Sequence, residues 1–200
     1  MNGDLFSNSL KPDWIELPDA KLLLIPDFLP STKADQCFSD LLEHVPWKQE
    51  AISLFGKSVL QPRVQAWYGD KSYTYSGLSM QPLPWLPILL RLKQQCESAS
   101  GHKYNSLLAN LYRDGKDSMG WHQDNEPELG RNPTIASLSL GGTRRFSLKH
   151  KFNDHKYQID LQHGTLLVMS GSTQHFWMHQ VAKTTKAVSP RINLTFRRII

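Results

Sequence analysis

The sequence has only two cysteines and no long apolar run, and each shortage excludes a class of protein. Its longest apolar runs, residues 22–25 and 86–90, fall far short of the roughly 20 residues of a membrane-spanning helix. The two cysteines, Cys37 and Cys96, favour free thiols over a disulfide framework. They predict an intracellular protein, cytoplasmic in a bacterium and nuclear in a eukaryote. Residues 1–13 lack a basic stretch followed by an apolar one, so we expect no secretory signal.

The sequence also lacks a repeat, a low-complexity tract and a linker between its halves. With 200 residues, 40% of them hydrophobic and 20% charged, it predicts one folded domain, residues 1–200, that acts as a monomer. The formal net charge is +5, and the excess belongs to one half. Residues 1–109 hold 10 Lys and Arg against 11 Asp and Glu, whereas residues 110–200 hold 13 against 7. Such an excess is compatible with nucleic acid or with an anionic metabolite.

Helical patterns are confined to the first half of the chain. Residues 1–30 contain four prolines and are expected to be irregular. Apolar residues recur at helical spacing from Ser31, a predicted cap, to Pro46. A second helix is expected from Pro87 to Gly101.

Strand patterns dominate the rest. Gly69-Asp70 is predicted to join residues 65–68 and 73–75 in a hairpin. Beyond residue 105, short strands recur about every ten residues, and turn residues separate them. The expected strands are Ser106 to Tyr112, Thr134 to Leu140, Arg145 to Lys149, Tyr157 to Leu161, Thr165 to Met169, His175 to Met178 and Arg191 to Arg197. Together these elements predict a β-rich α+β fold with a double-stranded β-helix (jelly roll) core and N-terminal helices.

Two candidate metal ligands stand close together in the sequence. His122 and Asp124 are two residues apart, so in extended chain both side chains point to the same side. With one distant histidine they would form the triad that binds non-haem Fe(II) and leaves positions open. A hydrogen-bonded pair at a strand end and a structural zinc site are the alternatives. Four other histidines are expected to be structural or solvated: His44, His102, His155 and His163.

The run from Arg191 to Arg197 alternates polar and apolar residues. Arg191, Asn193, Thr195 and Arg197 share one face of this predicted strand. Facing inward, its two arginines would suit a small dicarboxylate, because each can bind a carboxylate through two hydrogen bonds. At a surface, the same pattern would be an ordinary amphipathic edge.

With these motifs the sequence resembles the AlkB family of Fe(II)- and 2-oxoglutarate-dependent nucleic-acid dealkylating oxygenases. The resemblance rests on residues 110–115, 122–124, His179 and 191–197, and it extends from about residue 55 to residue 198. It is greatest to the DNA-repair members with a hairpin before the catalytic core. The first 50 residues match weakly.

The resemblance implies a role for each matching residue. His122, Asp124 and His179 would bind the iron, with His179 preferred to His175 because it stands at the family's distance before Arg191. The residues implied for 2-oxoglutarate are Asn110, Tyr112, Arg191, Asn193 and Arg197. Iron, O2 and 2-oxoglutarate would oxidise the carbon on an alkylated base nitrogen, with release of CO2 and succinate. The resulting hemiaminal would release an aldehyde and the repaired base.

Further residues are implied in contact with alkylated DNA, duplex or single-stranded, or with RNA. Because a base inside a duplex cannot reach a buried iron, it must be flipped out. Phe55 would be the wedge, Arg63 a neighbouring nucleic-acid contact, and Tyr73, Tyr75 and Ser76 the hairpin residues lining the base pocket. Asn125 and Glu126 follow the metal-binding aspartate, where several relatives have a second Asp. Since an amide both donates and accepts, altered lesion preference is expected.

The resemblance also divides the chain. Residues 1–50 would be an N-terminal extension with the first helix, 51–104 a nucleotide-recognition region with a nucleic-acid-binding hairpin, and 105–200 the catalytic jelly roll. A basic cluster is expected to contact phosphates, and Lys183 and Lys186 would extend it. The cluster comprises Arg144, Arg145, Lys149, His150 and Lys151. The alternatives are the same chemistry on RNA or protein and an inactive nucleic-acid-binding relative.

Overall fold

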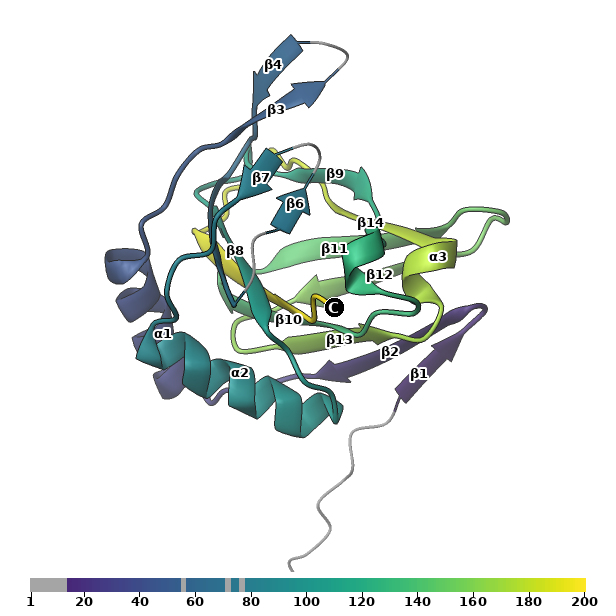
Figure 1. Ribbon diagram of the computed structural model, residues 1–200, viewed down its shortest axis with the longest axis horizontal. Coiled ribbons are helices and arrows are strands. Elements are labelled where there is room, and N and C mark those ends of the chain that lie inside the picture. Colours follow the sequence, from purple (N-terminus) through teal and green to yellow (C-terminus); the bar gives the residue numbers. More distant parts are fainter. Residues whose placement is uncertain (1–13, 55–56, 71–72, 76–77) are drawn as a thin grey trace, which may run out of the picture.

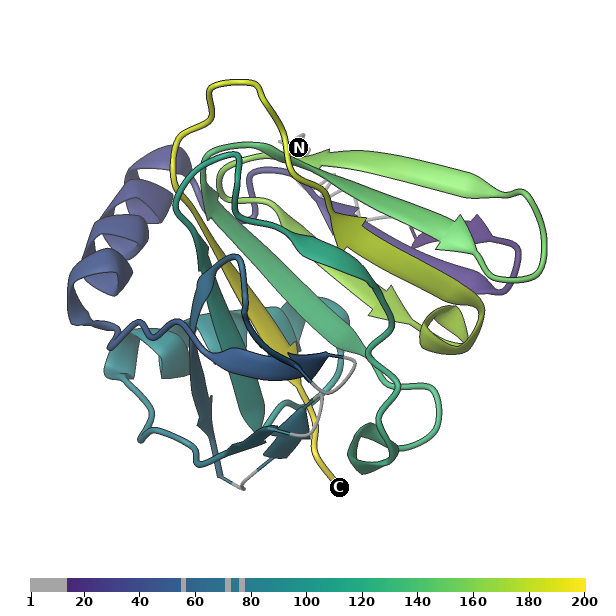
Figure 2. The same cartoon turned by 90° about the horizontal axis from the view of Figure 1, so that it is seen from above.

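Two antiparallel β-sheets pack face to face in this computed structural model, which describes residues 14–54, 57–70, 73–75 and 78–200 (Figures 1 and 2). In spatial order, the larger sheet contains β1 (Trp14–Leu17), β2 (Ala20–Ile25), β13 (Leu166–Ser170), β10 (Ile135–Gly141), β15 (Arg191–Arg197), β8 (Ser106–Tyr112) and β5 (Val64–Gly69). The smaller sheet contains β12 (Lys156–Leu161), β11 (Arg144–His150), β14 (Trp177–Val181) and β9 (Met119–His122). This is the β-rich jelly-roll architecture that the sequence predicts.

Alternation along the strands decides what faces the space between the sheets. In β15, Ile192, Leu194 and Phe196 pack into the core beneath the helices, while Arg191 and Arg197 line a pocket between the sheets. The neighbouring β8 is buried on both faces and follows the same alternation. A period-two pattern therefore separates the packing face from the chemical face.

The helices α1 (Ser31–His44) and α2 (Pro87–Ser100) cover the outer face of the larger sheet (Figure 1). As expected, α2 begins at Pro87 and ends before Gly101, which has the left-handed backbone (φ 73°) that favours glycine. The expected cap of α1 is wrong. Pro30 occupies the cap position, and no side-chain hydrogen bond caps the helix within the part of the chain that the structure describes.

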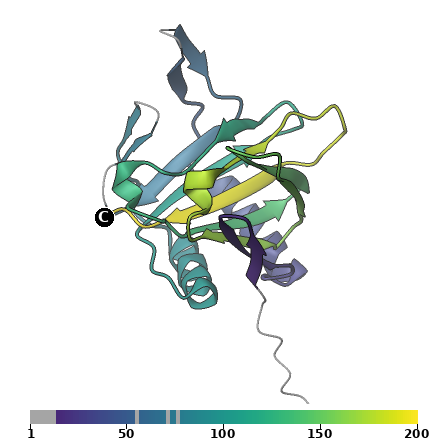
Figure 3. The ribbon, with the colours of Figure 1, turned by 90° about the vertical axis from the view of Figure 1, so that its right-hand side faces the viewer.

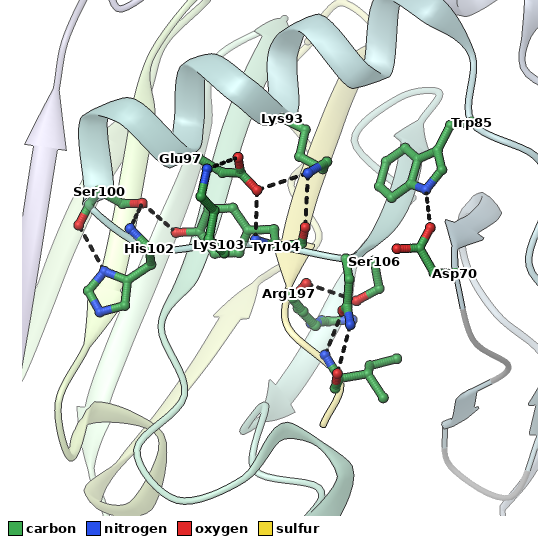
Figure 4. Close-up of polar contacts among 12 residues, drawn as sticks. Asp70, Trp85, Lys93, Glu97, Ser100, His102, Lys103, Tyr104, Ser106 and Arg197 are labelled. Atoms are coloured by element: carbon green, nitrogen blue, oxygen red, sulfur yellow. Dashed lines mark hydrogen bonds and ion pairs between the residues drawn. The ribbon is translucent and has the colours of Figure 1, made fainter.

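A charged network ties the end of α2 to the start of β8 (Figure 4). The buried Glu97 carboxylate accepts hydrogen bonds from Lys93 Nζ at 2.8 Å, Lys103 Nζ at 3.1 Å and the Tyr104 backbone N–H at 2.9 Å. Burial would raise the pKa of Glu97, but these hydrogen bonds and the lysine charge lower it below the ordinary value. The network fixes the strand whose far end reaches the pocket.

The expectation that residues 1–30 are irregular is wrong for residues 14–25. There, β1 pairs with β2, and β2 pairs with β13, so this segment forms one edge of the larger sheet. Pro18 lies in the turn between the two strands, beside Asp19 with its positive φ of 57°. Prolines therefore excluded a helix there but left room for strands between them.

The predicted hairpin at Gly69-Asp70 is also wrong. Gly69 is the last residue of β5, which pairs with β8. A Cβ at Gly69 would lie 3.1 Å from the backbone oxygen of Asn105, so this glycine permits a close approach between strands. The following strand, β6 (Tyr73–Tyr75), pairs with β7 (Leu78–Met80), and β3 (Ala51–Leu54) pairs with β4 (Lys57–Leu60).

The strand expected from His175 to Met178 is only partly present. Residues Thr173–Phe176 form the short helix α3, and β14 begins at Trp177. A second short helix, η1 (Pro127–Leu129), follows the end of β9. Figure 3 shows α3 near the centre of one side of the molecule, with η1 beside it. Both short helices flank the segments that carry the candidate metal ligands.

Candidate active site

A pocket between the two sheets brings together the candidate residues from four strands and one loop. Its empty volume, with its mouth included, is about 510 Å³. Its lining includes all of the residues assigned by resemblance to iron and 2-oxoglutarate: Asn110, Tyr112, His122, Asp124, His179, Arg191, Asn193 and Arg197. Residues up to 87 positions apart in sequence therefore face one space.

Strand pairing places the two histidines together. His122 at the end of β9 lies directly opposite His179 in β14, and their ring centres are 4.1 Å apart. Asp124 follows in the next loop, with Oδ1 3.9 Å from His122 Nε2. The three potential ligand atoms all lie within 4.8 Å of one another. His175 lies outside this group, since its Nε2 accepts a hydrogen bond from the Asn132 N–H at 3.4 Å.

Hydrogen bonds fix the His122 side chain and the loop that carries Asp124. His122 Nδ1 donates to the Gly120 carbonyl at 2.8 Å, because a carbonyl can only accept. That bond leaves Nε2 with the lone pair that a metal requires. The backbone N–H of Asp124 donates to Gln174 Oε1 at 2.9 Å and holds the loop in place.

The electrostatics suit a divalent cation. Burial alone would raise the pKa of Asp124, but the charge of Arg197 and the neighbouring histidines lower it to about 2. Burial, with repulsion from His122, lowers the pKa of His179 to about 3, and burial also lowers the pKa of His122. At neutral pH the pocket therefore presents one carboxylate and two neutral imidazoles, the forms that ligate metals. The donor set fits Fe(II).

Arg191 also lines the pocket, with part of its guanidinium unsatisfied. The residue is 1% exposed, and its Nη2 donates to Ser139 Oγ and Asn193 Oδ1, each at 2.8 Å. Its Nε and Nη1 atoms have no hydrogen-bond partner within the described ranges. Burial lowers the pKa of Arg191 to about 10, which leaves it charged at neutral pH. A buried cation with free donors is costly alone and fits a bound carboxylate.

Tyr112 stands between two guanidinium groups. Its ring centre is 5.3 Å from Cζ of Arg191 and 5.6 Å from Cζ of Arg144. Arg144 is buried and donates to the backbone carbonyls of Asp114, Asp117 and Ala182. Arg144 thereby holds two loops against the ring that packs on Arg191.

The structure places Arg63 inside the pocket wall and not on the surface. It is 2% exposed, and its Nε donates to Asn110 Oδ1 at 2.7 Å. The predicted nucleic-acid contact of Arg63 stays a prediction, and from this position Arg63 can meet only a group that enters the pocket.

Most of the predicted base-recognition residues are not tested by the structure. Phe55 and Ser76 lie outside the described residues. Tyr73 and Tyr75 belong to β6, which pairs with β7 in a two-stranded sheet. Asn125 is exposed and Glu126 half-buried just after Asp124, at the start of η1.

The expected basic cluster is wrong as a surface patch. Arg144 is buried as described, and His150 is buried 5.3 Å from the Trp177 ring with Nε2 3.3 Å from Asp19 Oδ2. Arg145 is exposed but forms two hydrogen bonds with the Asp160 carboxylate, at 2.9 and 3.0 Å. Lys149, near the end of β11, and Lys151, in the turn that follows, remain on the outside. A run of basic residues in a half-buried strand alternates between surface and core, which its composition does not show.

Gln174 and Ser139 contribute to the pocket without having been predicted. Both are buried, and both reach their partners across the fold. Neither has a local sequence signal, because a single glutamine or serine is common in any segment. Only the fold shows their contacts.

Comparison with known proteins agrees with this geometry. Residues 21–197 match the model of the 2OG-Fe(II) oxygenase superfamily. "Alpha-ketoglutarate-dependent dioxygenase alkB homolog 3" of Homo sapiens is 44% identical over 205 residues, covering 98% of this chain and 70% of that protein. The chain belongs to the AlkB family. Its AlkB relatives include the Bos taurus protein of the same name, 48% identical over 90% of this chain and 66% of its own.

A second AlkB relative carries a more specific name. "DNA oxidative demethylase ALKBH2" of Homo sapiens is 38% identical and covers 84% of this chain and 69% of its own length. The chain spans about two thirds of the length of these curated relatives. As an AlkB-family protein it is an enzyme that uses Fe(II), 2-oxoglutarate and O2.

Solved structures of low identity support the fold alone. The structure of OsALKBH1 has a TM-score of 0.64 at 18% identity and covers 93% of this chain and 100% of its own. A prolyl hydroxylase from Trichoplax adhaerens has a TM-score of 0.60 at 17% identity, and the match covers 89% of this chain and 83% of the hydroxylase chain. Among the described residues, no helix is both long and apolar enough to cross a membrane.

Proposed function

We propose that this AlkB-family enzyme oxidatively dealkylates N-alkylated DNA bases, such as N1-methyladenine and N3-methylcytosine. The observation that carries the proposal is a single buried pocket that joins a His-Asp-His group to an arginine with free donors. The products would be the repaired base, an aldehyde, succinate and CO2. The printed name of the ALKBH2 relative, DNA oxidative demethylase, supports the choice of substrate.

Three residues would hold the iron and the others the cosubstrate. His122, Asp124 and His179 would bind Fe(II), which with 2-oxoglutarate and O2 supplies the oxidant for an alkyl C–H bond. Arg191 would bind a carboxylate of 2-oxoglutarate through the donors it does not use within the protein. Arg197 would serve the metal end, because it already lies against Asp124.

The remaining polar groups of the pocket would complete this binding. Asn110 and Tyr112 lie opposite Asn193 and Arg191 in the pairing of β8 with β15, so all four side chains belong to one stiff surface. Apolar side chains from both sheets also line the pocket and limit water around the reacting groups: Leu108, Met119, Phe146, Met169 and Val181. The chain thus supplies orientation and a shielded space, while the bound groups supply the oxidation.

The alkylated base would be flipped into the pocket mouth. Phe55 would fill the vacated stack, and Tyr73, Tyr75 and Ser76 would contact the base. Asn125 and Glu126 follow Asp124 and would meet its polar edge. We propose Arg63 as a contact within the pocket, because its guanidinium reaches no other space.

The test uses the full chain purified without oxygen and loaded with Fe(II). Mass spectrometry follows N3-methylcytosine oligonucleotides with and without 2-oxoglutarate, while succinate is measured in parallel. We expect demethylation that depends on 2-oxoglutarate, abolished by His122→Ala and unchanged by His102→Ala, an exposed histidine outside the pocket. No demethylation and no substrate-stimulated succinate would refute the proposal.

Matched substrates separate the alternatives. Single-stranded DNA, duplex DNA and RNA of one sequence are compared by kcat/KM. Faster turnover of RNA than of both DNA forms would make RNA the substrate. Binding of methylated DNA without any turnover, unaffected by His122→Ala, would identify an inactive nucleic-acid-binding relative.

A further inference from the structure

An exposed tryptophan stands next to a candidate iron ligand. Trp121 precedes His122 in β9, and while His122 lines the pocket, Trp121 is 37% exposed. Lys149, from β11, places its Nζ 4.5 Å from the centre of the Trp121 ring. Lys149 lies between buried Leu148 and His150, so it shares the outer face of the smaller sheet with the indole.

A second pair of the same kind lies beyond the end of β11. Phe152 is 72% exposed, and Lys151 Nζ is 5.2 Å from the centre of its ring. Lys151 Nζ also donates to the His175 carbonyl at 3.2 Å, and Gln123 Nε2 donates to the same carbonyl at 3.1 Å. Lys151 and Gln123, which follow Lys149 and Trp121 by two residues each, thus meet at α3, the helix near the centre of Figure 3, and the second pair continues the first toward this helix.

We propose that Trp121 and Lys149, continued by Lys151 and Phe152, form a stacking platform for nucleotides that flank the target base. The inference rests on the proposed function, since it assigns the neighbours of the base held in that pocket. Each pair offers an apolar ring for a base and a cation for a phosphate, which are the two groups that every nucleotide repeats. Four residues with two cations and no carboxylate favour a polyanion over a protein partner.

The position of Trp121 adds a geometric argument. Trp121 and His122 are adjacent in β9, so their side chains point to opposite faces of the sheet, and because β9 is the edge strand of the smaller sheet, the outer face with Trp121 and the pocket face with His122 meet at this edge. A strand that gives up one base to the pocket leaves the neighbouring base unstacked on one side. If the nucleic-acid strand passes around this sheet edge, the exposed indole on its outer face can replace the lost stacking partner.

A double-mutant cycle, with one change in the protein and one in the nucleic acid, tests the platform. The ligands are single-stranded pentanucleotides with central N3-methylcytosine, intact or with an abasic site 5′ or 3′ of it. Fluorescence anisotropy gives Kd with Mn(II) and 2-oxoglutarate, so that turnover is not needed. For the intact ligand we expect Trp121→Ala to raise Kd roughly tenfold, the size expected for one stacked base, and Trp121→Phe to raise it less. Leu42→Ala, at an exposed leucine of α1, is the matched control and should change nothing.

The decisive result is non-additivity. An abasic site on one side should weaken binding to the wild type as much as Trp121→Ala does and should not weaken the variant further. Full additivity on both sides, or an unchanged Kd in Trp121→Ala, would overturn the platform. Lys149→Gln keeps the Trp121 ring and removes the cation. The slope of log Kd against log salt should therefore fall by the amount expected for about one phosphate contact. An unchanged slope contradicts the role of Lys149.

The platform and the proposed function can fail separately. Demethylation by the wild type together with unchanged binding in Trp121→Ala would leave the function standing and reject the platform. Absence of demethylation together with the expected non-additive binding would reject the function and leave the platform standing. A change in the KM for 2-oxoglutarate in Trp121→Ala equal to the change in Kd would show that Trp121 acts through His122 and would also reject the platform.

Discussion

The Nη2 atom of Arg197 lies 2.9 Å from Oδ1 of Asp124, and each side chain is only 3% exposed. This contact joins the strand that would bind 2-oxoglutarate to the loop that would bind iron. Because its charge stabilises the Asp124 carboxylate against burial, Arg197 keeps a metal ligand ionised. The two candidate binding sites therefore share one ion pair.

Removing the guanidinium should make metal binding sensitive to acid. In the wild type the pKa of Asp124 is about 2, so the ligand stays ionised as the pH falls. In Arg197→Gln burial remains while the charge is lost, so that pKa rises and protons displace the metal at a higher pH. We expect Mn(II) affinity to fall roughly tenfold to a hundredfold, as measured by calorimetry between neutral and acidic pH. Arg198→Gln, at an exposed neighbour, is the control.

Arg191 should control 2-oxoglutarate affinity with little effect on the metal. Arg191→Met removes the charged donors and should raise the KM for 2-oxoglutarate roughly tenfold to a hundredfold. Because the arginine is buried with free donors, the same change should leave the Tm without 2-oxoglutarate equal or higher. A large fall in Tm would contradict this reasoning. Mn(II) affinity serves as the internal control.

Arg144 should matter for stability although it lies outside the proposed binding contacts. Arg144→Met removes the donor to three backbone carbonyls, one of them in a buried hydrogen bond, and loosens Tyr112, at a cost of about 3 kcal/mol in the free energy of unfolding. Urea denaturation measures the loss. Arg145→Ala, one residue away but exposed, should leave the urea midpoint almost unchanged. Equal effects of the two changes would argue against the role of Arg144.

Glu97 should make stability depend on pH near the pKa of free glutamate. Its pKa in the folded protein lies below 4.5, so its stabilisation is fully present above that pH and is lost as the pH falls through the folded value. Glu97→Gln should cost about 2 kcal/mol at neutral pH, and the difference should shrink in acid. Thermal unfolding across this pH range, with exposed Glu43→Gln as control, measures both effects.

The strands with strong alternation could be predicted to the residue. The boundaries of β8 and β15 agree with the sequence because each alternates between two environments over seven residues. The two-residue spacing of His122 and Asp124 also brings both side chains to one site, although Asp124 lies in a loop after the strand. Pattern and spacing are local properties, so the sequence carries them.

What the sequence could not show depends on distant partners. The strand β2 exists because β13, more than 140 residues later, pairs with it. Arg63 and Arg144 are buried only because carbonyl and amide acceptors from other segments surround them. Charge by itself predicts exposure, so these residues seemed to belong to the surface.

The pairing of His122 with His179 has a mechanical consequence. The four-residue strand β9 is the edge of the smaller sheet, where backbone hydrogen bonds fray most readily. A metal held by both histidines would fasten this edge to β14, and amide hydrogen exchange in β9 should slow most when the ion binds. Loss of iron would then loosen Trp121 along with the strand. An enzyme without its metal would therefore also bind the nucleic acid less tightly.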